Sequence, residues 1–428
     1  MDIVELSDRR WRGEDLNQKS NPLGELGTVS EITDGVAFLP NFANCTAIAT
    51  DDGLVMVDTG SPLTAELVHR ETRSWSALPL HSAVYSHGHI DHVFGVGPFE
   101  EEATANGWRA PHVLAHAHLP RRFDRYIQTA GYNEIINQRQ FAAPNLHWPR
   151  EYRYPDETYE LEHEFAVGST QFRLRHEKGE TDDATVTWIP DAGVLCSGDL
   201  FIWNSPNAGN PQKVQRYPLE WAEALRRMVD LEASFLLPGH GLPIFGRERI
   251  RQALTETAEY LESLVEQTLA LMNSGARLAE ALVTVKVPSH LTDRPYLQPY
   301  YDEPEFIVRN IWRLYGGWWD GNPANLRPAH ERTLAEELAQ LAGGANALAT
   351  RAEKLLENGS NEELRLAGHL AEMAWLAAPT DPGVQAVRQR VFHGLAENAT
   401  STMSRGVFNW AERETIREET PMSNTHGS

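Results

Sequence analysis

The chain has 428 residues, 41% of them hydrophobic, which is enough for a sizeable core and more than one typical domain needs. Its formal net charge of −22 argues against nucleic acid as a partner and against a basic membrane-surface role. The only cysteines, Cys45 and Cys196, lie in apolar runs, which excludes a disulfide scaffold. No apolar stretch reaches membrane-spanning length and residues 1–6 do not resemble a signal peptide, so we expect a cytoplasmic protein.

The first part of the chain predicts an α/β domain behind a short arm. Residues 1–34 are polar and predict an irregular N-terminal arm, whereas residues 35–286 alternate β-rich runs with helical patterns. A turn at residues 51–53 predicts a pair of strands, and a helix through residue 74 follows. The later strands are expected at residues 82–85, 159–165, 171–176, 185–189 and 194–196.

The second part of the chain changes character. Residues 250–272 form one long amphipathic helical pattern, and residues 287–330 are rich in Pro, Tyr and Trp, which predicts an ordered but irregular connection. Helical segments separated by Gly- and Pro-containing stop signals follow from residue 330. We therefore predict an all-α domain over residues 287–418 and a disordered tail over residues 419–428.

A cluster of potential metal ligands follows the strand expected at residues 82–85. His87, His89, Asp91 and His92 fall within six residues. Imidazole nitrogen and carboxylate oxygen suit zinc, and iron or manganese less specifically. Alternate residues of an extended segment face one side, so His87 and His89 can bind one metal together while Asp91 and His92 reach a second. Four such ligands in six residues favour a metal site over ordinary histidines.

Three later segments, residues 179–183, 196–200 and 237–241, each offer a further ligand at a strand end. Together with the cluster they resemble the metallo-β-lactamase superfamily over about residues 35–250. The resemblance implies an αββα sandwich that carries two metals at the edge between its sheets. It makes Asp58 a supporting residue and Asp91 and Asp199 the candidate catalytic residues. The metal ligands it implies are His87, His89 and Glu180 for the first metal, Asp91, His92 and His240 for the second, and Asp199 between the two.

One position moves the resemblance toward a particular branch. The superfamily usually has a histidine as the third ligand of the first metal, whereas the spacing to the following strand puts Glu180 there, with His176 as the competitor. A carboxylate at this position is similar to the alkyl sulfatases, although that branch typically has a glutamate where Asp199 stands. Residues 310–323 also resemble a signature of the alkyl sulfatase dimerisation domain, which implies a homodimer, with an unrelated helical cap as the alternative.

The resemblance implies a hydrolase that cleaves sulfate esters of apolar alcohols. Two Zn²⁺ ions, or Fe or Mn, would share a water and lower its pKa so that hydroxide is available near neutral pH. The substrate would be a small anionic molecule with an apolar part. Lys213 and Arg216 are the candidates to bind its charge, with Asn207 or Asn210 as neutral donors, unless these are solvated loop residues.

Two other functions stay open from the sequence. A lactonase, or another ester hydrolase of the same fold, would keep the metals and change the substrate. A binding module would use a structural metal and contact its partner through the helical half, although structural sites usually hold a single, fully coordinated ion. Aromatic residues between 296 and 319 are expected either to wall an apolar pocket or to fill a domain interface.

Overall fold

The computed structural model describes residues 2–14 and 27–416, so the tail predicted over residues 419–428 lies outside the described residues. The chain separates into two compact units. The first comprises Met1–Asn133 and Trp148–Trp318, and the second comprises Glu134–His147 and Trp319–Ser428. The boundary predicted between residues 286 and 287 therefore falls inside the first unit.

Two mixed β-sheets form the centre of the first unit, as far as the described residues go. One has the strand order β1-β2-β3-β4-β5-β6-β7 and the other the order β13-β12-β11-β10-β9-β8. Strands β4 to β7 pair in parallel, as do β11 and β12. The strands are β1 (Ser30–Thr33), β2 (Val36–Leu39), β3 (Cys45–Thr50), β4 (Gly53–Val57), β5 (Leu80–Val84), β6 (His112–His116), β7 (Glu157–Tyr159), β8 (Glu162–Val167), β9 (Thr170–Glu177), β10 (Ala184–Ile189), β11 (Val194–Ile202), β12 (Phe235–His240) and β13 (Ile244–Phe245).

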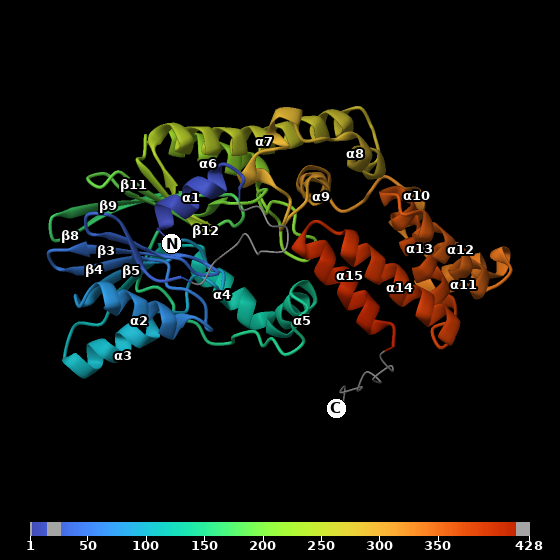
Figure 1. The fold of residues 1–428 in the computed structure, drawn as a ribbon, viewed down its shortest axis with the longest axis horizontal. Coiled ribbons are helices and arrows are strands. Elements are labelled where there is room, and N and C mark those ends of the chain that lie inside the picture. Colours follow the sequence, from blue (N-terminus) through green and yellow to red (C-terminus); the bar gives the residue numbers. More distant parts are fainter. Residues whose placement is uncertain (1, 15–26, 417–428) are drawn as a thin grey trace. The chain divides into compact units, whose positions relative to one another are not determined.

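Helices cover the outer faces of both sheets. The helices α2 (Ala65–Trp75) and α3 (Gly97–Asn106) lie on one side, and α6 (Pro218–Val229) and α7 (Arg247–Asn273) on the other (Figure 1). Successive side chains of a strand point to opposite faces, and β4 shows the consequence. Val55 joins the core shared with the second sheet, whereas Met56 packs with Val68 and Phe99 of the outer helices. The αββα sandwich is thereby confirmed.

The segment expected to be an irregular arm contains a helix, α1 (Ile3–Trp11), as well as β1. The Asp2 side chain caps α1 by accepting a hydrogen bond from the Val4 amide at 3.1 Å. Ile3 is buried, and the Trp11 ring stacks on Tyr296 at 5.3 Å between centroids. The polar composition of this segment did not predict the helix, because only a few of its side chains enter the core.

The connection predicted to be irregular contains a helix of thirteen residues, α9 (Pro304–Gly316). Pro304 occupies its first turn, where a missing N–H costs nothing, and Ile307 and Ile311 are fully buried at helical spacing. Tyr296 is likewise buried in the core, whereas the Trp318 side chain is 70% exposed. The remaining elements of this region are α8 (Leu278–Thr284), η1 (Ser289–Leu291), η2 (Pro295–Leu297) and α10 (Pro323–Leu326).

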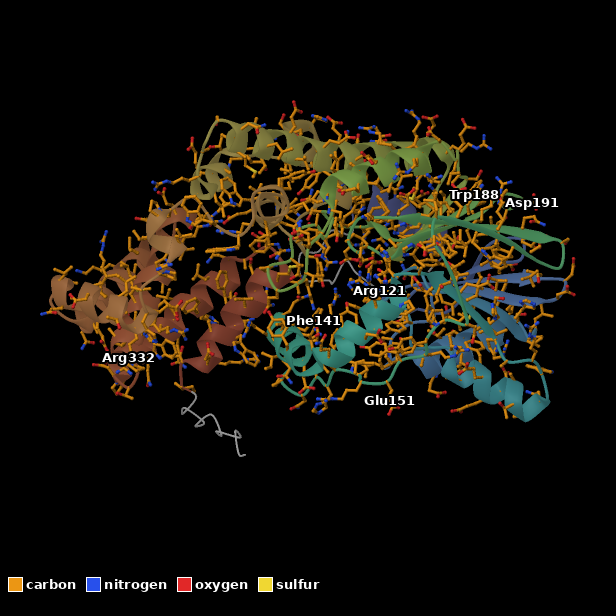
Figure 2. The ribbon with its side chains drawn as sticks, turned by 180° about the vertical axis from the view of Figure 1, so that it is seen from behind. Arg121, Phe141, Glu151, Trp188, Asp191 and Arg332 are labelled. Atoms are coloured by element: carbon orange, nitrogen blue, oxygen red, sulfur yellow. The ribbon has the colours of Figure 1, made fainter. Side chains whose placement is uncertain are left out.

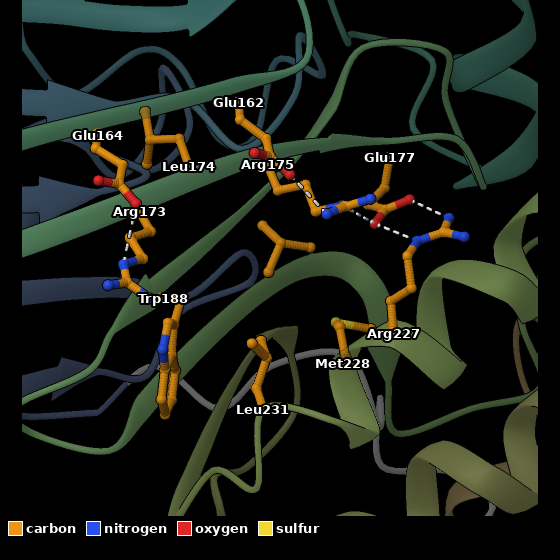
Figure 3. A pocket seen from close by; sticks show the side chains of 11 residues that line it. Glu162, Glu164, Arg173, Leu174, Arg175, Glu177, Trp188, Arg227, Met228 and Leu231 are labelled. Carbon is orange, nitrogen blue, oxygen red and sulfur yellow. Dashed lines mark hydrogen bonds and ion pairs between the residues drawn. The ribbon is translucent and has the colours of Figure 1, made fainter.

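A shallow depression of about 240 Å³ lies on the outer face of the second sheet, near the β10–β11 hairpin that Trp188 and Asp191 mark (Figure 2). Acidic and basic side chains pair around it (Figure 3). Arg175 Nη1 lies 2.7 Å from Glu162 Oε1, and Arg173 Nε lies 3.1 Å from Glu164 Oε1. The third arginine at the depression, Arg227, pairs with Glu177. Because each positive charge has a carboxylate beside it, this depression offers little to an anionic ligand.

As far as residue 416, where the described part of the chain ends, the second unit is all-α, which confirms the helical character predicted for this region. Its core consists mainly of Ala, Leu and Val side chains from successive helices. Ser360, Asp381 and Ser401 cap three of the helices through their side-chain oxygens. Its helices are α11 (Glu331–Ala342), α12 (Ala345–Asn358), α13 (Asn361–Ala377), α14 (Pro382–Asn398) and α15 (Thr402–Glu414). Of the two helices that follow β6, α4 (Leu119–Gln128) belongs to the first unit, and α5 (Ala130–Gln140) contains the boundary between the units.

Within the described parts of the chain, none of the helices combines the length and the apolar character that crossing a membrane requires.

Candidate metal centre

Side chains from four separate segments meet at one edge of the two sheets. The histidine cluster follows β5, Glu180 follows β9, Asp199 lies in β11 and His240 ends β12. Among the described residues, these side chains form two groups. Within each group, the candidate ligand atoms all lie within 4.8 Å of one another. The first group is His87, His89, Glu180 and Asp199, and the second is Asp91, His92 and His240. The structure thus brings together all seven residues that the sequence nominated as ligands.

Asp199 stands between the two groups. Its Oδ1 lies 3.4 Å from His92 Nε2, and its Oδ2 lies 3.3 Å from His240 Nε2 and 3.7 Å from His87 Nε2. The carboxylate therefore faces imidazoles of both groups, which is the placement expected of a ligand shared between two cations.

The donor atoms at this edge fit divalent metals. His92 Nε2, Glu180 Oε2 and Asp199 Oδ1 are buried, and none has a hydrogen-bond partner among the described residues. Burial, reinforced by Asp199, raises the pKa of Glu180 to about 8, and burial lowers the pKa of His87 to about 3. A cation between these groups would compensate the carboxylates and accept the imidazole lone pairs, which is the chemistry of a zinc-type site.

Neighbouring groups orient the histidines. Asp58 has φ 58°, a left-handed conformation that costs free energy for a residue other than glycine. Its carboxylate accepts hydrogen bonds of 2.7 Å from the Ser86 amide and from His92 Nδ1. His240 Nδ1 similarly donates to the Phe42 carbonyl. Fixing Nδ1 in this way turns the Nε2 atoms of both histidines toward Asp199, which is the supporting role expected of Asp58.

A second support for the cluster was missed from the sequence. Asp183 Oδ2 accepts hydrogen bonds from the Gly88 amide at 3.0 Å and from Arg122 Nε at 2.9 Å. Gly88 leaves room for this pair, since a Cβ there would lie 2.7 Å from Arg122 Cδ. Arg122 lies on α4, about sixty residues from its partner, and nothing in the local pattern of either segment pointed to the other.

His176, the competitor of Glu180, belongs to a different cluster with His116 and His118. The rings of His116 and His176 stack 3.6 Å apart at an angle of 6°. A metal binds in the plane of an imidazole, so two parallel rings do not share one ion. Instead, His118 Nδ1 and His176 Nε2 each donate to the Asp182 carbonyl at 3.0 Å, which holds the segment that carries Glu180.

The residues predicted to bind substrate lie beside the first group of ligands. Asn207 Nδ2 donates to Glu180 Oε1, and Arg216 Nη2 lies 3.3 Å from the same oxygen. Arg216 is 2% exposed, and its Nε is a buried donor with no acceptor among the described residues. Lys213 is half-buried over the Trp148 ring, and burial, helped by Arg216, lowers its pKa to about 7. Asn210 Oδ1 instead accepts from the Gln212 amide at 3.0 Å.

Two family models match the chain. Residues 39–240 match the metallo-beta-lactamase superfamily, and residues 277–418 match alkyl sulfatase dimerisation. A linear primary-alkylsulfatase of Pseudomonas sp. (strain ATCC 19151) is 26% identical over 69% of this chain, and the alkyl/aryl-sulfatase BDS1 of Saccharomyces cerevisiae is 24% identical over 82%. The chain spans about 60% of the length of these curated relatives, at 60% and 57% respectively.

Solved structures support the same fold. The stereoselective inverting sec-alkylsulfatase Pisa1 from Pseudomonas sp. superposes with a TM-score of 0.81 at 22% identity, over 93% of this chain and 67% of that one. The sandwich, the ligand groups at its edge and the two family models agree. Residues 39–240 therefore carry a domain of the metallo-beta-lactamase superfamily, and residues 277–418 carry one of the alkyl sulfatase dimerisation type.

Proposed function

We propose that the protein is a metal-dependent hydrolase that cleaves sulfate esters of apolar alcohols. The observation that carries this proposal is the position of Glu180, a carboxylate in the first ligand group with a buried arginine directly beside it. The curated relatives named as alkylsulfatases and alkyl/aryl-sulfatases support the choice of substrate class.

The site would hold two divalent cations, for which zinc is our first choice and iron or manganese the alternatives. His87, His89 and Glu180 would hold the first, Asp91, His92 and His240 the second, and Asp199 would contact both. When bound, such cations supply Lewis acidity, which lowers the pKa of a coordinated water and neutralises negative charge on a substrate.

The protein's own residues bind the anion and hold the ligand side chains in place. The buried Arg216 guanidinium supplies positive charge that a sulfate ester requires in a chain of net charge −22, and the half-buried Lys213 side chain, whose pKa is about 7, is a further hydrogen-bond donor. Asn207 and Arg216 also hold Glu180 in place. The Asp91 side chain is 18% exposed, and its Oδ2 lies 3.5 Å from His240 Nε2, so the carboxylate faces both the second ligand group and the solvent.

A substrate panel tests the proposal. Purified protein would be supplied with alkyl and aryl sulfates of increasing chain length, for which sulfate release is followed by ion chromatography. Lactones and phosphodiesters would be supplied in parallel, and their hydrolysis followed by the release of acid. We expect sulfate release from alkyl sulfates and its loss after chelation. Hydrolysis confined to lactones or phosphodiesters would reject the sulfatase and favour the alternative ester hydrolase.

We also propose that the protein forms a homodimer through α11. Leu334, Leu338 and Leu341 are 46%, 39% and 83% exposed and lie on one face of that helix, whereas Ala335 and Ala339 on an adjacent face are buried. An exposed leucine face at helical spacing is typical of a helix that pairs with another. A second copy is the occupant we favour, because the family model that includes α11 is described as a dimerisation domain.

Leu338→Glu is expected to convert the dimer to a monomer, because it places a charge in the centre of this leucine face. Light scattering of the full chain measures the mass. Gln340→Glu adds the same charge on the same exposed helix outside the leucine face and should leave the dimer intact. A single-chain mass for the unmodified protein, or an unchanged dimer in Leu338→Glu, would contradict the proposal.

A further inference from the structure

The loop of residues 204–216 carries Lys213 and Arg216, which we propose bind the anion, and Asn207, which holds Glu180. It follows β11 and contains neither helix nor strand. A loop without regular secondary structure is held only by the contacts that other segments make with it. In this structure those contacts come largely from residues 298–313, which lie within the match to the alkyl sulfatase dimerisation model and include α9.

Asp302 holds the first half of the loop. It is fully buried, and its Oδ2 accepts a hydrogen bond of 2.6 Å from the Gly209 amide. Its carbonyl accepts from Ser205 Oγ at 2.8 Å. The loop comes so close to α9 that a Cβ on Gly209 would lie 2.1 Å from the Ile307 nitrogen. The path of the chain on either side of Asn207 is therefore fixed by this segment.

Asn310 holds the second half of the loop. Its Oδ1 accepts from the Arg216 amide at 3.3 Å, and its Nδ2 donates to the Arg216 carbonyl at 3.1 Å. The amide side chain thus pairs with the main chain of Arg216 as a neighbouring strand would. Arg313 keeps Asn310 in this orientation, because its Nη2 donates to Asn310 Oδ1 at 3.1 Å. Asn310 itself is 5% exposed, and its side-chain hydrogen bonds among the described residues go to Gln215, Arg216 and Arg313 and to none of the metal-ligand candidates.

We infer that Asn310 is a positioning residue for the anion site: it fixes the Arg216 main chain, and through it the guanidinium that lies on Glu180. The inference rests on the proposed function. It extends that function, because a residue within the match to the dimerisation model would then influence substrate affinity through Arg216. Without Asn310, the Arg216 guanidinium would no longer be fixed beside Glu180, while the seven proposed metal ligands would keep their positions.

The test compares Asn310→Ala, Asn310→Asp and the matched control Arg309→Ala, whose side chain is 50% exposed on the same helix. For Asn310→Ala we expect two constants to rise about tenfold: KM for an alkyl sulfate and the inhibition constant of inorganic sulfate. A tenfold rise corresponds to a loss of about 1.4 kcal/mol of binding free energy. We expect kcat and metal content to change little. Asn310→Asp keeps the acceptor and loses the donor, so it should lie between Asn310→Ala and the unmodified protein.

Hydrogen exchange of residues 205–216 provides a readout that does not need activity. Asn310→Ala should speed exchange there, and Arg309→Ala should not. Equal exchange in the two variants, or a KM that is unchanged in Asn310→Ala, would overturn the inference. Sulfate release absent from every variant, including the unmodified protein, would reject the proposed function instead, and the exchange comparison would still decide whether Asn310 orders the loop.

Discussion

Asp199→Asn is expected to lower sulfate release by more than about 100-fold, because even residues that only orient metal ligands contribute about 10–100-fold. The substitution keeps the shape of the side chain but replaces one carboxylate oxygen by an amide group. Both oxygens face imidazoles, at 3.4 Å from His92 Nε2 and 3.3 Å from His240 Nε2. The measurement is the initial rate of sulfate release with metal supplied in excess.

Asp191→Asn is the matched control for this prediction. Asp191 is exposed in the turn between β10 and β11 (Figure 2), so the same chemical change there should leave the rate unaltered. If Asp199→Asn retained more than about a tenth of the unmodified rate, Asp199 would not have the shared role we assign to it.

Arg122→Leu is expected to destabilise the first unit by about 3–5 kcal/mol, because it leaves a buried carboxylate without its partner. Arg122 is 4% exposed and Asp183 is fully buried. Burial alone would raise the pKa of Asp183, but Arg122, His87 and the Thr181 hydroxyl together outweigh this effect and bring it to about 2. The pair is therefore charged at neutral pH, and the free energy of unfolding from denaturant titration measures its loss.

The neighbouring Arg121→Leu provides the comparison. Arg121 is exposed on the same helix (Figure 2), so this variant should stay within about 0.5 kcal/mol of the unmodified protein. Equal stability of the two variants would mean that the Arg122–Asp183 pair does not support the loop that carries His87 and His89.

The sequence predicted those parts of the site that depend on local spacing. The cluster from His87 to His92 is contiguous, and the alternation of strands with helical patterns predicted an α/β layered domain, whereas the αββα sandwich itself was implied by the family resemblance. Glu180, Asp199 and His240 are far apart in the chain and came from the family resemblance, since spacing alone does not bring separate strand ends together.

Contacts between distant segments could not be predicted. In the sequence, Arg122 and Asp183 are indistinguishable from ordinary charged residues. They pair only because α4 packs beside the loop that carries Asp183. Asn310 lies in a stretch rich in Pro and aromatic residues, whose composition concealed the helical spacing of Ile307 and Ile311. The polar segment before residue 30 did not predict α1 for a similar reason, because Ile3 is the one apolar residue among the three that α1 buries. In each case tertiary packing, which composition does not report, decides the structure.

The most direct test of the central claim is the metal content of the purified chain, measured by inductively coupled plasma mass spectrometry next to Asp199→Asn. Two groups of ligands that share Asp199 predict about two divalent ions per chain in the unmodified protein and a marked loss in the variant. Full sulfate release by metal-free protein, or equal metal content in the two proteins, would contradict the account.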